Sequence, residues 1–166
     1  MRGVVVAVLL LAVAASAEEE RLLPACAASK CSGKVLTEFG LLRICVPRGV
    51  RSKTEPGAHG DQSTLITIKK RGKRHALEIV LGPHNSGRDP RKGDTRWTVS
   101  RWRCTGSLSG EDYRLVADGL YTRYVTLNAI VGFARYDAVP PEVATRFDKI
   151  LDTLCCGECT VCAAKP

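Results

Sequence analysis

Eight cysteines limit what this chain of 166 residues can fold into, because all of them follow an N-terminal segment typical of exported proteins. Their number is even, and cysteines in oxidising compartments form disulfides by default. Each bond would stabilise the folded state by roughly 2–4 kcal/mol. Spacing alone does not select among the many pairings. We therefore expect a domain stabilised by disulfides, with Cys26, Cys31, Cys45, Cys104, Cys155, Cys156, Cys159 and Cys162 as candidates.

Residues 1–17 have the organisation of a secretory signal peptide. Arg2 supplies a positive charge, residues 4–15 are an unbroken run of Val, Ala and Leu, and Ala15-Ser16-Ala17 matches the small-x-small cleavage pattern. The run is shorter than the roughly 20 residues that span a bilayer. We expect cleavage near Ala17 and a secreted or periplasmic protein whose mature chain has no transmembrane segment.

Several short β-strands are predicted between residues 34 and 136. Residues 35–46 predict one or two strands, and residues 47–62, with Pro, Gly and scattered charges, predict a loop. Alternation of apolar and polar residues on both sides of Gly72 predicts a β-hairpin over residues 66–81. A long polar loop is expected from residue 82 and a Gly/Ser loop over residues 105–110. Further strands are predicted at residues 96–104, 113–117, 121–127 and 130–136, with a hairpin turn at Asp118-Gly119.

One amphipathic helix is predicted to begin at Pro140-Pro141-Glu142, because proline and an acidic residue both suit a first helical turn. Its apolar stripe contains Val143, Phe147, Ile150, Leu151 and Leu154. Its solvent side is expected to carry Arg146, Asp148, Lys149 and Asp152, and Gly157 suits its C-terminal end.

These elements predict an α+β fold with a mostly antiparallel sheet of about six to seven strands, on which the C-terminal helix packs. The length suits a single domain. We expect a signal peptide at residues 1–17, an N-terminal arm at residues 18–33, a single α+β domain at residues 34–156 and a Cys-rich tail at residues 157–166.

The C-terminal cysteines allow a second interpretation. Cys156, Cys159 and Cys162 have the spacing that begins a bacterial ferredoxin site, but position 166, where a fourth ligand would fall, is proline. With Cys155 they would offer four thiolates for zinc or copper(I), and Cys159-x-x-Cys162 could be redox-active. The export argument favours disulfides, since an oxidising compartment pairs thiolates. We expect the adjacent Cys155 and Cys156 to join different partners, and no cofactor.

Basic residues are concentrated in one region of the chain. Residues 43–103 carry fifteen basic and five acidic side chains, while the formal net charge of the whole chain is +8. The densest cluster surrounds the predicted hairpin turn and consists of Lys69, Lys70, Arg71, Lys73 and Arg74. Such clusters neutralise phosphates or sulfates with little selectivity. The alternative is a solvated turn that keeps an edge strand from aggregating.

Evidence for catalysis is thin. Signature motifs of hydrolases, metalloproteases and nucleotide-binding proteins are absent from the sequence. His84, in a polar loop with Asn85, Ser86 and Arg88, is the one grouping that resembles an active-site loop. Trp97 and Trp102 are expected on opposite faces of a strand, with one in the core.

We therefore expect a secreted or periplasmic binding domain, not an enzyme, with a polyanion, a glycan or an acidic protein as its partner, bound through the basic hairpin. The alternatives are a thiol- or metal-binding protein that uses Cys155, Cys156, Cys159 and Cys162, and a small hydrolase that uses His84.

Overall fold

The computed structural model of the protein describes residues 20–26, 31–38, 41–56, 61–82, 96–105, 108–127 and 132–157. The predicted signal peptide lies outside these residues and stays a prediction. Within them, no helix is both long enough and apolar enough to cross a bilayer.

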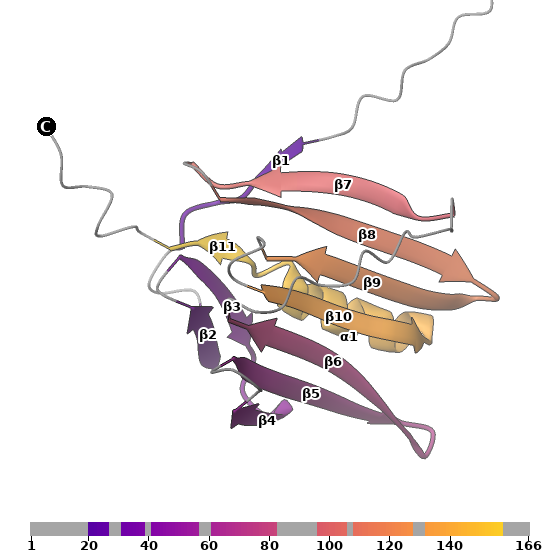
Figure 1. The fold of residues 1–166 in the computed structure, drawn as a ribbon. Helices are drawn as coiled ribbons and strands as arrows, with labels where there is room; N and C mark the ends of the chain where they lie inside the picture. Colours follow the sequence, from indigo (N-terminus) through magenta and orange to yellow (C-terminus); the bar gives the residue numbers. More distant parts are fainter. Residues whose placement is uncertain are drawn as a thin grey trace, which may run out of the picture.

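An eight-stranded sheet forms the larger layer of the fold (Figure 1). Neighbouring strands are antiparallel except β1 and β7, which are parallel. In spatial order the strands are β1 (Glu20–Leu22), β7 (Thr98–Arg103), β8 (Ser109–Ala117), β9 (Leu120–Thr126), β10 (Gly132–Val139), β6 (Lys73–Leu81), β5 (Gln62–Lys70) and β4 (Arg51–Pro56).

A helix and a small sheet form the second layer. Helix α1 (Pro141–Leu151) packs against β9 and β10 of the large sheet and against β3 of the small one (Figure 1). Pro at its start and Glu142 in its first turn suit a helix N-terminus, as the sequence predicted. The small sheet has the order β11 (Cys155–Cys156), β3 (Leu42–Val46) and β2 (Lys34–Glu38), and all its pairs are antiparallel.

The main core lies between the two layers. The helix contributes its predicted stripe up to Leu151, with Phe147 fully buried, and Leu154 joins the same core just after the helix. Strand β3 contributes Ile44. Trp102 of β7 also belongs to this core and packs directly over Gly110, where any Cβ would overlap the indole ring. Burial of such side chains supplies most of the favourable free energy of folding.

A smaller aromatic cluster lies on the opposite face of the large sheet. It contains Val80, Tyr113, Tyr124 and Phe133, with Trp97 packed against it. The rings of Tyr124 and Phe133 stack with centroids 5.5 Å apart, and Trp97 meets Tyr113 edge-on at 6.5 Å. Trp97 and Trp102 thus belong to clusters on opposite faces, which confirms the prediction for this pair.

The α+β class, the C-terminal helix and the disulfides are confirmed, but the predicted number of strands and the single sheet are wrong. The described residues form eleven strands in two sheets, whereas about six to seven strands in one sheet were predicted. One pairing of named strands, between β1 and β7, is parallel, and the others are antiparallel, so the large sheet is mostly antiparallel as predicted. Periodicity in sequence predicts that a segment is extended, but it does not say which segment it pairs with, so the second sheet was not foreseen.

Three segments differ from their predicted structure. Residues 51–56, expected in a loop, form edge strand β4, in which every residue is exposed, so no apolar alternation marks it. Residues 109–110, expected in a loop, open β8, and the absence of a side chain at Gly110 leaves room for the Trp102 ring. Helix α1 ends at Leu151, well before Gly157, because Cys155 and Cys156 pair as β11 with β3.

Candidate functional site

The basic cluster forms the tip of a two-residue β-hairpin turn. Strand β5 ends at Lys70 and β6 begins at Lys73, with Arg71 and Gly72 between them. Both turn residues have positive φ, 48° at Arg71 and 79° at Gly72, as a type I′ turn requires. Gly72 adopts this conformation without strain, whereas Arg71 occupies a position where Asn or Asp is favoured. The predicted hairpin and its turn are therefore confirmed.

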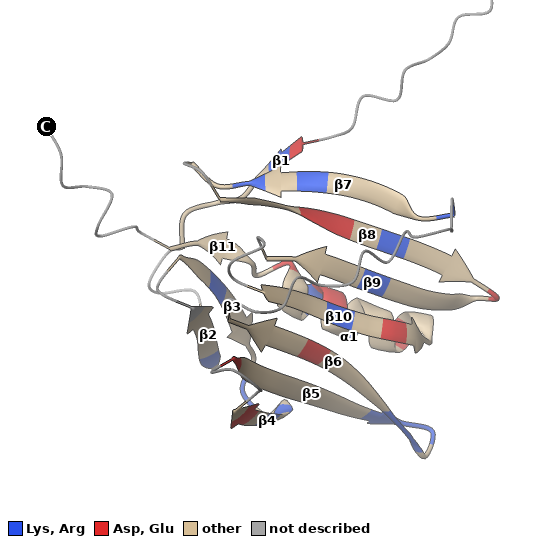
Figure 2. Cartoon of the chain, in the orientation of Figure 1, with Lys and Arg blue, Asp and Glu red and all other residues tan. Residues whose placement is uncertain are grey.

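Strand register places like charges directly opposite each other at this tip. Lys69 is paired with Arg74, and Lys70 with Lys73. All five basic residues of the cluster are exposed, and the basic turn is visible as the blue end of β5 and β6 in Figure 2. Like charges opposite each other in a sheet are destabilising, so this arrangement weakens the hairpin that carries it.

One acidic side chain approaches the tip. Lys70 Nζ lies 4.0 Å from the Glu142 carboxylate at the start of α1. Among the residues that the structure describes, no carboxylate lies within ion-pair distance of Lys69, Arg71, Lys73 or Arg74. The local charge is therefore mostly uncompensated, and it forms a concentrated positive potential in solvent.

Six of the eight cysteines form three disulfides, which confirms the prediction for these six. Cys26 is bonded to Cys155 and Cys104 to Cys156, so the adjacent cysteines join different partners as predicted. Cys31 is bonded to Cys45. The three bonds connect the N-terminal segment, strand β3, the end of β7 and the residues after the helix.

The proposed metal ligands overlap with these disulfides. Cys155 and Cys156 have no free thiol, so a four-thiolate site would require both bonds to be reduced. Within the described ranges, no three His, Cys, Asp or Glu side chains gather into a metal-binding group. Cys159, Cys162 and the loop with His84 lie outside the described residues.

A buried charged cluster that the sequence did not reveal joins the helix to the sheet. Arg123 of β9 is 3% exposed, and its Nε and Nη2 donate to Asp112 of β8 at 2.9 and 2.8 Å. Its Nη1 donates to Asp148 of α1 at 2.7 Å, and Nη2 also reaches Asp152 at 3.1 Å. Asp148 and Asp152, predicted on the solvent side of the helix, therefore face this arginine. The reason is that the apolar stripe occupies only part of the helix surface toward the sheet.

Burial and charge act in opposite directions on this cluster. Burial alone would lower the pKa of Arg123, but the hydrogen bonds and charges of Asp112 and Asp148 outweigh it and raise that pKa. Tyr136 donates its hydroxyl to Asp148 at 2.9 Å. Its burial, and then the Asp148 charge, raise the pKa of Tyr136 above the ordinary value. Arginine is thus held charged and tyrosine neutral, which suits a structural contact between helix and sheet.

Two small pockets flank the second layer. A pocket of about 280 Å³ lies beside the Arg123 cluster and is lined by Ser100, Trp102 and Arg114 among others. A second of about 270 Å³ lies beside the disulfides, with Val35 and Ile44 in its wall. Each is near the lower limit of the volumes that hold small ligands. The pockets therefore offer a weaker candidate for a functional site than the basic turn, whose paired like charges oppose folding.

The chain was compared with family models, curated proteins and solved structures. No family model, curated protein or solved structure matches the chain significantly.

Proposed function

We propose that this protein is an exported, disulfide-stabilised binding domain that docks an anionic partner through its basic hairpin turn. The proposal includes the signal peptide at residues 1–17. Three disulfides support it, because such bonds persist in secreted and periplasmic proteins.

One observation carries the proposal: the exposed turn pairs Lys69 with Arg74 and Lys70 with Lys73. A turn adapted for stability would place opposite charges or neutral residues at these positions. Arg71 adds a fifth positive charge at a backbone position that Asn or Asp would occupy with less strain. Unfavourable local choices of this kind are typical of functional sites.

Chromatography on heparin, a sulfated polyanion, tests the proposal. The mature protein is expected to be retained at low salt and to elute as salt screens the interaction. Four neutral substitutions should abolish most of this retention: Lys70→Gln, Arg71→Gln, Lys73→Gln and Arg74→Gln. The logarithm of the affinity should then depend less steeply on the logarithm of the salt concentration, by a slope change on the order of 3 for four lost contacts.

A control variant separates the turn from overall charge. It loses the same four charges at exposed positions on other elements: Arg21→Gln, Lys34→Gln, Arg103→Gln and Lys149→Gln. We expect this control to elute close to the wild type. Equal loss of retention in both variants would show that total charge is responsible, and unretained wild type at low salt would refute the proposal.

A further inference from the structure

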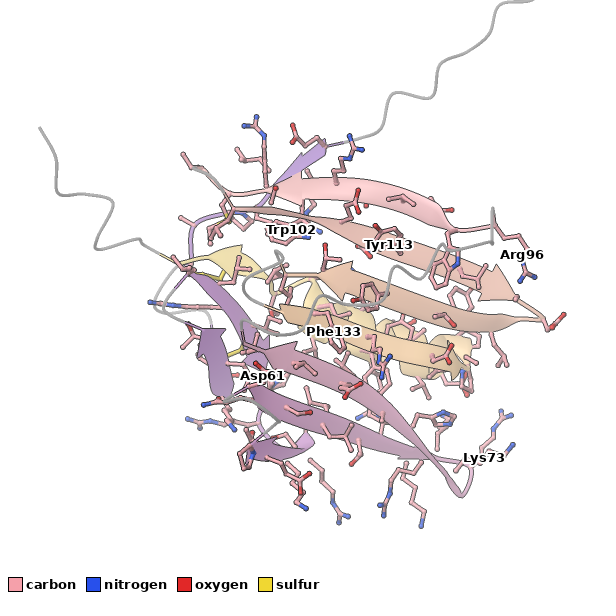
Figure 3. All side chains as sticks on the ribbon, in the orientation of Figure 1. Asp61, Lys73, Arg96, Trp102, Tyr113 and Phe133 are labelled. Carbon is pink, nitrogen blue, oxygen red and sulfur yellow. A yellow bond between two sulfur atoms is a disulfide. The ribbon has the colours of Figure 1, made fainter. Side chains whose placement is uncertain are left out.

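A second hairpin turn emerges at the same end of the large sheet as the basic turn. It joins β8 to β9 through Asp118 and Gly119, whose φ values are 52° and 72°. Strands β6, β10 and β9 are antiparallel neighbours in succession, so the start of β6 and the start of β9 lie at one end. Figure 1 shows both turns projecting on the same side, and Figure 3 places Lys73 and the exposed Arg96 there as well.

This second turn is apolar on both of its faces. Val116 is paired with Tyr121 on one face, and Ala117 with Leu120 on the other. The residues Val116, Leu120 and Tyr121 are 59%, 38% and 36% exposed. A hairpin that covers a core has one apolar face, because alternate residues point to opposite sides. No single core can bury both faces of this turn, so folding alone does not explain its composition.

We propose that this end of the sheet docks on an anionic lipid bilayer. The basic turn would contact lipid phosphates, and the apolar turn at residues 116–121 would enter the interfacial layer beneath them. The inference rests on the proposed function and names its partner.

An anionic bilayer complements both the charged turn and the apolar turn, whereas the other candidate polyanions complement only the charged one. A sulfated glycan or an acidic protein segment offers charge, but an anionic bilayer offers charge at its surface and an apolar layer directly below. Basic residues supply long-range attraction, and apolar residues supply a contact that salt does not screen.

Among the described residues, three carboxylates at this end limit the depth of the contact. Glu142 approaches Lys70, and Asp137 accepts a hydrogen bond from Thr122 at 2.9 Å. Asp118 occupies the apolar turn itself, where it suits the positive φ of a type I′ turn. A carboxylate there would be repelled by anionic lipids, so the turn would enter no deeper than the interfacial layer just beneath the phosphates. Asparagine at this position would keep the turn and remove the repulsion.

Co-sedimentation with lipid vesicles tests the inference on the mature, disulfide-bonded chain. The wild type is expected to bind vesicles of phosphatidylglycerol and phosphatidylcholine and not vesicles of phosphatidylcholine alone. Val116→Ser with Leu120→Ser should weaken vesicle binding on the order of tenfold, from the lost apolar burial, and leave heparin retention unchanged. Asp118→Asn should strengthen it.

The two assays together distinguish the two proposals. Heparin retention without binding to phosphatidylglycerol vesicles would overturn the lipid inference and leave a glycan or an acidic protein as the partner. Vesicle binding that Val116→Ser with Leu120→Ser does not change would also overturn it, because the contact would then be purely electrostatic. If the wild type neither bound heparin nor bound phosphatidylglycerol vesicles, the proposed function itself would be overturned. Peptide mapping of the three disulfides shows that each variant is folded.

Discussion

Replacement of Arg123 by methionine should destabilise the protein by about 3–5 kcal/mol, the usual cost of removing one partner from a buried ion pair. Methionine preserves much of the apolar volume of arginine and none of its charge. The Asp112 side chain is 11% exposed and would lose both hydrogen bonds that Arg123 donates to it, at 2.9 and 2.8 Å. Its carboxylate would then stay in a region of low dielectric without its main cation.

The exposed fraction of each carboxylate predicts how much stability its own replacement would cost. Asp152 is 49% exposed and meets Arg123 at 3.1 Å, so Asp152→Asn should cost less than about 1 kcal/mol. Asp148 is 27% exposed and also accepts from Tyr136, so its replacement should cost more than that of Asp152. Arg123→Met combined with Asp112→Leu should recover much of the lost stability, because the most buried of the three carboxylates is then no longer left opposite a neutral group.

Urea denaturation at neutral pH, with the disulfides intact, measures these effects. Fluorescence of the buried Trp102 reports the same core in which the helix packs. A loss of 3–5 kcal/mol corresponds to a fall in Tm on the order of 10 °C for a domain of this size. Two results would refute the reasoning: a loss under about 1 kcal/mol in Arg123→Met, or a double variant no more stable than the single one.

Three further predictions concern the turn, a tyrosine and a disulfide. Arg71→Asn should raise the free energy of unfolding by about 0.5–1 kcal/mol, since Asn suits positive φ, and it should weaken heparin retention. If stability and heparin retention both rose or both fell, the idea that Arg71 trades stability for binding would be contradicted. Burial and Asp148 raise the pKa of Tyr136 above 10.0, so the unfolded chain ionises first, and stability is kept below about pH 10 and lost as pH rises further. Tyr136→Phe should remove that part of the pH dependence in urea titrations, and an unchanged slope would show that another group is responsible. Serine at both Cys31 and Cys45, which are separated by 14 residues, should cost about 3 kcal/mol in chemical denaturation; a loss below about 1 kcal/mol would show that this bond constrains the unfolded chain little.

Features determined by neighbouring residues were predictable from the sequence. Both hairpin turns were recognised because Gly72 and Asp118-Gly119 carry their turn chemistry in adjacent positions. The helix was recognised because its apolar stripe repeats within three turns. The exposed basic turn followed from the same local information, since a charged tip between two apolar strands has nowhere to be buried.

Features determined by distant residues were not predictable. Strand β4 exists because its backbone pairs with β5, while its side chains are all exposed. The Arg123 cluster joins carboxylates that are 11, 25 and 29 residues away along the chain. Asp148 and Asp152 beside basic neighbours look like ordinary solvated charges until the sheet brings Arg123 beneath them. The apolar β8–β9 turn was also missed as a surface, because its residues are typical of a strand.

The disulfide between Cys26 and Cys155 has a consequence for biogenesis. Under the export proposed above, the chain would emerge with its N-terminus first, and these partners are 129 residues apart. An oxidase that joins cysteines in order of arrival would link Cys26 to Cys31, and Cys45 would then be left without its native partner. An exported chain of this pattern would then need a thiol–disulfide isomerase that reshuffles early, incorrect bonds once the C-terminal residues have arrived. In oxidative refolding of the reduced mature chain, addition of a thiol–disulfide isomerase should therefore speed the appearance of the native disulfide pattern.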